Sequence, residues 1–260
     1  MMTPEAINHA AALLAESRVA QLPFAGLPEE FRPAGEDDAY AVQDALRDRL
    51  GALTGYKIGC TTPVMQAYMG IAQPCAGGMS AATVHRRSAV LRRADFRRVG
   101  VECEIAVGIA ADLPFAVAPF DRATVGAAVG ACMAAIEVVE DRYVDMMSLG
   151  MPTLIADDFC AAGCVLGKPV TDWRELDLAA AAAAMTVNGI EVGRGTGAHV
   201  MGHPLEALVW LANALALRGR GLQAGDTVLT GSIVEVQWVE AGDQVTVAID
   251  GLGEAAARFT

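Results

Sequence analysis

The stretch Val101-Glu102-Cys103-Glu104-Ile105-Ala106-Val107 is an apolar run that carries two glutamates one residue apart. Such a run predicts a β-strand, and side chains alternate between the two faces of a strand, so Glu102 and Glu104 would share one face. Adjacent like charges destabilise a sheet. The pair therefore requires a bound cation, a shared proton or exposure to solvent.

The length and charge of the chain set wider bounds. Its 260 residues are enough for one large domain, or for a main domain with a smaller appendage. A formal net charge of -12 argues against nucleic acid and anionic membranes as partners. Residues 1–22 lack the features of a signal peptide, and no later stretch free of glycine and charge is long enough to span a bilayer. We expect a soluble, cytoplasmic protein.

Two helices are predicted near the N-terminus. Thr3-Pro4-Glu5 offers a capping hydroxyl, a proline suited to the first helical position and an early acid. A second helix is predicted from Asp37 to Leu50, where Gly51 ends it. We interpret residues 1–54 as a small helical region and residues 55–260 as the main domain.

The rest of the chain reads as short strands with glycine-rich turns. Asn188-Gly189 predicts a two-residue hairpin because both positions favour positive φ. Residues 224–228 and 241–245 each predict a turn followed by a strand. Helices are expected at Ala123 to Ala134 and at Pro204 to Leu217. Because helices do not regularly separate the strands, the pattern predicts an α+β fold.

Glu137 is a third acid in an apolar setting, within residues 135–139. A carboxylate there costs free energy to bury unless a charge or a hydrogen bond meets it. Glu102, Glu104 and Glu137 together would supply three hard oxygen ligands, which suit Mg²⁺ or Mn²⁺. Alternatively, Glu137 pairs with Arg142 or lies at a solvated strand end.

Lys57 is a lone cation in the strand-like segment Gly55-Tyr56-Lys57-Ile58-Gly59. Desolvation lowers the pKa of a lysine, so that it can act as an acid or base near neutrality, although many strand lysines reach solvent. Asp157 and Asp158 follow an apolar segment and would orient a lysine, shuttle a proton or cap a helix.

Possible substrate contacts lie later in the chain. Leu229-Thr230-Gly231-Ser232 ends an apolar strand with two hydroxyls around a glycine. Donors on Thr230, Gly231 and Ser232 would meet a carboxylate, and an ordinary turn explains the pattern equally well. Arg142 is a further candidate for binding the substrate.

Read in order, these segments resemble the 2-keto-4-pentenoate hydratase branch of the fumarylacetoacetate hydrolase superfamily, over nearly the whole chain. The most specific matches are Gly55–Gly59, Glu102-x-Glu104, 135–142, Ala156-Asp157-Asp158 and the stretch from Gly193 through 208–213 to Gly231.

The resemblance implies a mixed β-roll around a divalent metal ion, with residues 55–260 as the catalytic domain. It implies that Glu102, Glu104 and Glu137 are the metal ligands, that Lys57 is the acid/base residue and that Asp157 contributes near the site. The implied substrates are 2-hydroxy-2,4-dienoates or their 2-oxo tautomers from the degradation of aromatic compounds. Family members commonly form homo-oligomers, so we expect one here.

Our leading prediction is a Mg²⁺- or Mn²⁺-dependent hydratase, a lyase that adds water to such a substrate and gives a 4-hydroxy-2-oxo acid. Decarboxylation of a 2-oxo acid and hydrolysis of a carbon–carbon bond in an acylpyruvate use the same enolate, so both are alternatives. A third alternative is a non-catalytic, metal-binding homologue that serves as a partner subunit.

Residues 73–82 depart from the family pattern. The hydratases typically carry aspartates there, whereas Gln73-Pro74-Cys75-Ala76-Gly77-Gly78-Met79-Ser80-Ala81-Ala82 contains no acid. In addition, Asp158 and Cys160 stand where the branch often has an amide and a hydroxyl. The first change removes a candidate water-activating group, so the resemblance alone does not secure the hydration step.

Overall fold

The computed structural model describes residues 1–260 as an α+β protein. Six α-helices are present: α1 Pro4–Ala20, α2 Glu36–Leu50, α3 Pro63–Met69, α4 Arg122–Ala128, α5 Met151–Ala156 and α6 Pro204–Leu217. Twelve strands are present: β1 Leu53–Gly59, β2 Cys75–Ser80, β3 Val84–Arg86, β4 Ser88–Leu91, β5 Val99–Ile109, β6 Val129–Glu140, β7 Ala161–Leu166, β8 Ala182–Val187, β9 Ile190–Thr196, β10 Thr227–Trp238, β11 Gln244–Ile249 and β12 Gly253–Phe259.

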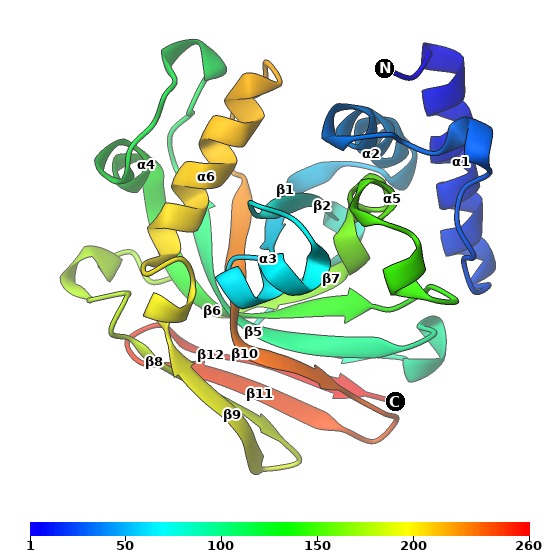
Figure 1. Ribbon diagram of the computed structural model, residues 1–260. Helices are drawn as coiled ribbons and strands as arrows, with labels where there is room; N and C mark the ends of the chain where they lie inside the picture. Colours follow the sequence, from blue (N-terminus) through cyan, green and yellow to red (C-terminus); the bar gives the residue numbers. More distant parts are fainter.

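The strands form two sheets of mixed direction. One has the order β2-β1-β10-β5-β6-β7-β3, and the other has the order β4-β12-β11-β8-β9. In the larger sheet β1 runs parallel to β10, while β5 is antiparallel to both β10 and β6. Figure 1 shows α1 and α2 on one flank of the sheets and α4 and α6 on the other. The predicted mixed β-roll of the α+β class is confirmed.

Several local predictions are also confirmed. α1 begins at Pro4, and the Thr3 hydroxyl accepts a hydrogen bond from the backbone N–H of Ala6. α2 ends where Gly51 takes a positive φ of 102°. The turn at Asn188-Gly189 joins β8 to β9, with positive φ at both residues. Each of these features depends on a few neighbouring residues, which is why the sequence alone predicts it.

The prediction of a helix from Ala123 to Ala134 is wrong in its second half. α4 stops at Ala128, and β6 begins at Val129. β6 pairs with β5 from Ile109↔Val129 to Val99↔Glu140, and with β7 on its other side. Alanine, which is frequent in this segment, favours helix intrinsically, but the pairing of β6 within the sheet overrides that preference.

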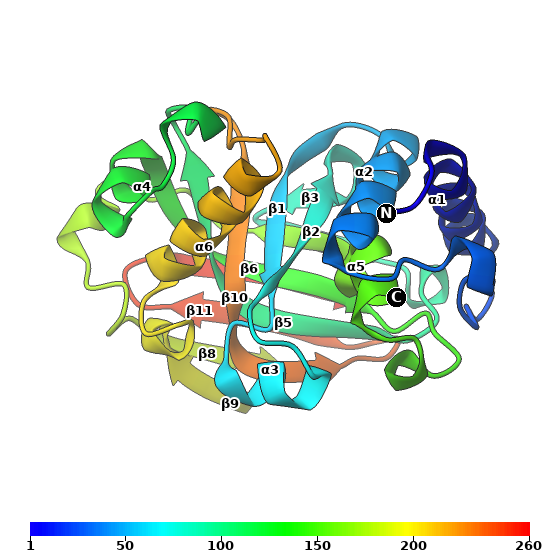
Figure 2. The same cartoon turned by 45° about the horizontal axis from the view of Figure 1, so that its top comes forward.

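The N-terminal helices pack against the side of the larger sheet. Leu14 of α1 and Leu46 of α2 belong to the same continuous apolar core as Ile58 and Ile155. α2 contacts both α5 and β2, and Figure 2 shows α2 beside α5. This places α1 and α2 close to the segment that follows α5. The division of the chain at residues 54 and 55 stays a prediction.

One segment, Gly197–Leu217, is long and apolar enough to cross a membrane by length and composition alone. It is interrupted at Gly202, which has a positive φ, and α6 starts only at Pro204. The leucines of α6 that face the sheets are buried: Leu205, Leu208, Leu211 and Leu215. The segment therefore contains the core helix of this fold.

Candidate metal centre and active site

The pairing of β5 with β6 brings the three glutamates together. Glu102 lies directly opposite Glu137 in the ladder, and Glu104 lies two residues further along β5 on the same face. One carboxylate oxygen from each residue lies within 4.8 Å of the other two. Glu104 and Glu137 are buried, and Glu102 is partly buried.

The oxygen atoms of this cluster fit a divalent cation. Glu104 Oε1 and Glu137 Oε2 are buried and have no hydrogen-bond partner. The other Glu104 oxygen, Oε2, accepts a hydrogen bond of 2.8 Å from the backbone N–H of Gly231. Unpaired buried carboxylate oxygens are costly, and hard oxygen donors suit Mg²⁺ or Mn²⁺. The residues present could therefore hold such an ion.

The protonation of the cluster leads to the same conclusion. Burial raises the pKa of Glu102 to about 7, with a further rise from Glu137 that Lys57 partly offsets. Burial, Glu137 and Glu102 also raise the pKa of Glu104. Without a metal ion the cluster relieves its repulsion by holding protons, and a cation bound there displaces them.

Lys57 is the cation of this cluster. It lies on β1 and is only 3 % exposed, with Nζ 3.0 Å from Glu137 Oε1. Nζ also donates to the carbonyl of Phe159 at 3.3 Å and lies 5.0 Å from the centre of the Phe159 ring. Burial opposes the charge of Lys57, but Glu137 and Glu102 outweigh it and raise its pKa, so the lowered pKa expected from desolvation alone is wrong. Glu137 is thus paired with Lys57 and not with Arg142, and Lys57 does not extend to solvent.

A cavity of about 300 Å³ lies beside these residues. Lys57 and Glu137 line it together with Arg142 and Asp158. Its volume is at the lower end of the range for small-molecule sites. The cavity therefore suits a small polar substrate.

Asp157 lies in an ion-pair cluster outside the lining of this cavity. Its Oδ1 accepts from Arg18 Nε at 2.7 Å, and its Oδ2 accepts from Arg142 Nη1 at 2.8 Å and from the Tyr143 hydroxyl at 2.9 Å. Burial opposes ionisation, but Arg18 and Arg142 outweigh it and lower the pKa of Asp157. Arg142 also donates to the carbonyl of Ala161 at 3.0 Å. Asp157 is therefore a fixed anion that anchors the end of α5.

Residues 230–232 of β10 lie beside Glu104, because Ser232 is opposite Glu104 in the ladder between β10 and β5. The Thr230 hydroxyl donates to the carbonyl of Ile105 at 2.8 Å, and the Gly231 N–H holds the Glu104 carboxylate. The Ser232 hydroxyl donates within its own strand. These contacts position a metal-ligand candidate, and the role of the three residues in substrate binding stays a prediction.

Sequence reasoning missed three residues that shape the site. Arg18 reaches Asp157 from α1, Arg47 reaches Asp158 from α2, and Phe159 supplies the carbonyl that holds Lys57. No local signal marks these contacts, because Asp157 and Asp158 each lie more than 100 residues from the arginine that they contact. The contact of Phe159 is made by a backbone atom, which any residue type carries.

Comparisons with known proteins agree with this architecture. Residues 68–260 match the family described as fumarylacetoacetate (FAA) hydrolase, C-terminal. The chain is 34 % identical over 261 residues to a 2-keto-4-pentenoate hydratase of Paraburkholderia phymatum, covering 98 % of this chain and 97 % of the relative. It is 32 % identical to a 4-oxalocrotonate decarboxylase of Pseudomonas putida, covering 85 % of this chain and 84 % of the relative.

A solved structure extends the comparison to three dimensions. The 4-oxalocrotonate decarboxylase of Pseudomonas putida G7, complexed with magnesium and adipate, superimposes with a TM-score of 0.93 at 28 % identity. The match covers 100 % of this chain and 99 % of that one. The resemblance seen in the sequence is confirmed, and the protein belongs to the fumarylacetoacetate hydrolase family.

Proposed function

We propose that the protein is a divalent-metal-dependent hydratase of 2-hydroxy-2,4-dienoates, acting in the degradation of aromatic compounds. It adds water to the 2-oxo tautomer and releases a 4-hydroxy-2-oxo acid. The observation that carries the proposal is the buried Glu102, Glu104 and Glu137 cluster with Lys57 in contact at 3.0 Å. Relatives named 2-keto-4-pentenoate hydratase, 34 % identical over nearly the whole chain, support the choice of reaction.

Glu102, Glu104 and Glu137 would hold Mg²⁺ or Mn²⁺. When bound, the ion supplies positive charge that stabilises the negative charge developing on the 2-oxo group. The solved relative that contains magnesium supports this choice of cofactor. The oxygen atoms of Glu104 and Glu137 that lack partners are the ones available to the ion.

Lys57 relays the proton that converts the dienol into the conjugated 2-oxo-3-enoate. Its Nζ is desolvated and held at 3.3 Å by the Phe159 carbonyl, so the ammonium group has a fixed position in the cavity. Asp157 orients Lys57 indirectly, because its ion pairs with Arg18 and Arg142 anchor the segment that contains Phe159. Arg142 lines the cavity and contacts the substrate from there. Thr230, Gly231 and Ser232 of β10, which lie outside that lining, contribute from beside Glu104.

A second candidate function is decarboxylation of a 2-oxo acid. The observation in its favour is the superposition with the 4-oxalocrotonate decarboxylase, at a TM-score of 0.93. Hydrolysis of a carbon–carbon bond in an acylpyruvate requires the same site. Product analysis separates the reactions, because decarboxylation releases carbon dioxide, hydrolysis yields two acids and hydration yields a single product.

The direct test incubates the purified protein with 2-hydroxypenta-2,4-dienoate and Mg²⁺. We expect the absorbance of the dienol to disappear and 4-hydroxy-2-oxopentanoate to form. If the loss of absorbance does not exceed the uncatalysed rate and does not depend on metal, the hydratase proposal is wrong. Turnover by the isolated protein would also exclude the non-catalytic partner subunit.

We further propose that the protein acts on a small molecule in the cytoplasm and that it forms a homo-oligomer. The net charge of -12 supports the absence of nucleic acid or a membrane surface as a partner. Exposed apolar side chains on α3, including Val64 and Tyr68, support burial against another subunit. Light scattering on the purified protein would measure the number of subunits.

A further inference from the structure

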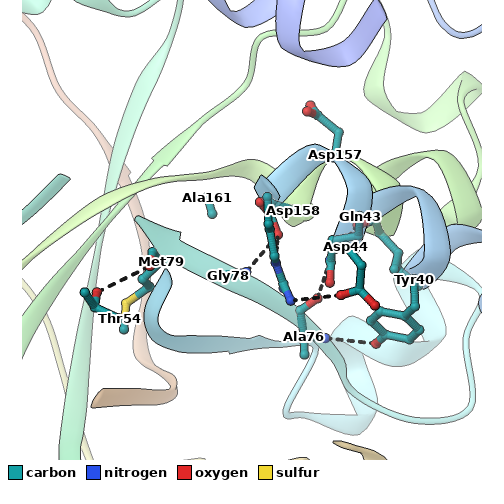
Figure 3. Close-up of polar contacts among 12 residues, drawn as sticks. Tyr40, Gln43, Asp44, Thr54, Ala76, Gly78, Met79, Asp157, Asp158 and Ala161 are labelled. Carbon is teal, nitrogen blue, oxygen red and sulfur yellow. Dashed lines mark hydrogen bonds and ion pairs between the residues drawn. The ribbon is translucent and has the colours of Figure 1, made fainter. Parts of the chain in front are cut away.

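The absence of acids from residues 73–82 leaves the water molecule without an obvious base. β2 pairs with β1 so that Gly77 lies opposite Lys57. The segment that follows α5 brings a carboxylate to this same place, because Asp158 Oδ1 accepts a hydrogen bond of 2.8 Å from the Gly78 N–H. Figure 3 shows Asp158 directed toward Gly78, while its neighbour Asp157 points away.

The two carboxylate oxygens of Asp158 have different surroundings. Oδ1 is fixed by the Gly78 N–H and by Arg47 Nε, which lies 3.0 Å away. Asp158 is only 3 % exposed, but its Oδ2 has no hydrogen-bond donor in the chain and is not among the fully buried atoms. Asp158 lines the same cavity as Lys57 and Glu137. One oxygen is therefore anchored and the other is free to meet a molecule in the cavity.

The backbone reaches this position under strain. Asp158, Phe159 and Cys160 have φ values of 54°, 44° and 64°. Residues other than glycine rarely take such values, and strain of this kind gathers at functional sites. Asp158 and Phe159 both contact the site, through a side chain and a carbonyl respectively.

Gly77 makes this approach possible. A Cβ atom at position 77 would lie 2.6 Å from the Asp158 carbonyl oxygen and 3.0 Å from Lys57 Cδ. Any larger residue at position 77 would therefore displace the Asp158 backbone or the Lys57 side chain. The glycines of β2 leave room for Asp158, whose carboxylate reaches β2 from the segment that follows α5.

A purely structural role for Asp158 would be to neutralise Arg47, which is itself 7 % exposed. Arg47 has a second carboxylate nearby, because Asp44 Oδ1 lies 3.7 Å from its Nη1. An ion pair with Arg47 also leaves unexplained why Oδ2, on a residue that lines the cavity, has no donor in the chain. The combination of an anchored oxygen, a free oxygen and a strained backbone is typical of a group that acts on a ligand.

We propose that Asp158 is a further catalytic residue, the general base that activates water for hydration. The inference rests on the proposed function. The water oxygen bonds to C4 of the 2-oxo-3-enoate, the C3=C4 π pair moves to form the enolate, and a water proton passes to Asp158 Oδ2. The Lys57 ammonium group then protonates C3. Asp158 returns its proton to Lys57 through solvent, which restores both groups.

The test is the Asp158→Asn variant, because an amide keeps an acceptor oxygen for Gly78 and Arg47 but is a far weaker base. We expect hydration of 2-hydroxypenta-2,4-dienoate to fall by about 10²–10⁴-fold. Two readouts should stay near wild type: Mg²⁺ affinity by calorimetry, and Mg²⁺-dependent exchange of the C3 hydrogens of 2-oxopentanoate in D₂O. The exchange requires an enolate but no attacking water.

The matched control is Asp44→Asn, which removes the other carboxylate near Arg47 and does not line the cavity. We expect it to hydrate at close to the wild-type rate. If Asp158→Asn hydrates at the wild-type rate, the role of Asp158 is wrong but the proposed function stands. The same holds if the variant loses hydration and hydrogen exchange in parallel. If the wild-type protein exchanges hydrogens but hydrates no dienoate, the proposed function fails and this inference falls with it.

Discussion

The site has two halves that are built in opposite ways. Glu102, Glu104 and Glu137 are brought together by the register of paired strands, and Lys57 comes from a strand of the same sheet. The segment 157–160 is instead held by long arginine side chains from α1 and α2. Backbone pairing fixes the strand half, which is formed by the three glutamates and Lys57, whereas ion pairs position the loop half, which is formed by residues 157–160. Changes in the two halves should therefore affect different measurements.

The largest effect is expected from Glu104→Gln in the strand half. Glutamine offers no negative charge, so we expect Mg²⁺ binding and turnover to disappear. Because burial raises the pKa of Glu104 and disfavours its charge, the metal-free variant should be at least as stable as the wild type. Calorimetry with Mg²⁺ and thermal unfolding measure the two effects. Strong Mg²⁺ binding by the variant would contradict the assignment of Glu104 as a ligand.

Lys57→Ala is expected to separate chemistry from metal binding within the same half. Removing the acid/base group should lower kcat by about 10²–10⁴-fold. Mg²⁺ affinity should be retained, because the three glutamates remain and a neighbouring positive charge is removed. Steady-state kinetics and calorimetry are the measurements. Unchanged turnover would show that another group moves the proton.

Arg18→Ala probes the loop half. The substitution removes a hydrogen bond from a buried carboxylate, so unfolding free energy should fall by about 1.5–3 kcal/mol in urea. Turnover should fall with it because Phe159 and Lys57 lose their fixed positions, while Mg²⁺ affinity stays unchanged. Arg18→Lys is the matched control and should recover only part of the loss, since one ammonium group cannot reproduce the three guanidinium contacts. A large loss of Mg²⁺ affinity would show that the two halves are not separable.

The smallest effect is expected from pH. Glu102 has a pKa raised from 4.5 to about 7 in the metal-free protein, so the stability that its proton contributes is fully present below pH 4.5 and is lost as pH rises from there through about 7. Mg²⁺ must displace this proton at low pH. Because Glu104 also has a raised pKa, the affinity should rise by at least about tenfold per pH unit below pH 7. Calorimetry from pH 6 to 8.5 measures the slope, and a flat profile would show that Glu102 is already ionised before binding.

The strand half was largely predictable from sequence. Alternation along β5 places Glu102 and Glu104 on one face, and the hydrophobic flanks of Glu137 mark it as buried. Sequence could not show that Glu137 lies opposite Glu102, because that register depends on the pairing of two strands. The same pairing turned the second half of an expected helix into β6.

The loop half could not be predicted to the same degree. Asp157 and Asp158 are neighbours of the same residue type, and sequence gives no means of choosing which one faces the cavity. The choice depends on positive φ values at Asp158, Phe159 and Cys160, together with arginines that approach from distant helices. The sequence showed that residues 73–82 lack the acids typical of the family. It could not show that Gly77 leaves room there for Asp158.

Hydrogen exchange tests the central claim, that the three glutamates and Lys57 form a metal-dependent enolisation site. We predict that the wild-type protein exchanges the C3 hydrogens of 2-oxopentanoate in D₂O only when Mg²⁺ or Mn²⁺ is present, as followed by proton NMR. Exchange should stop on chelation of the metal and should be lost in Glu104→Gln. Rapid exchange that persists without metal, or in Glu104→Gln, would contradict the account.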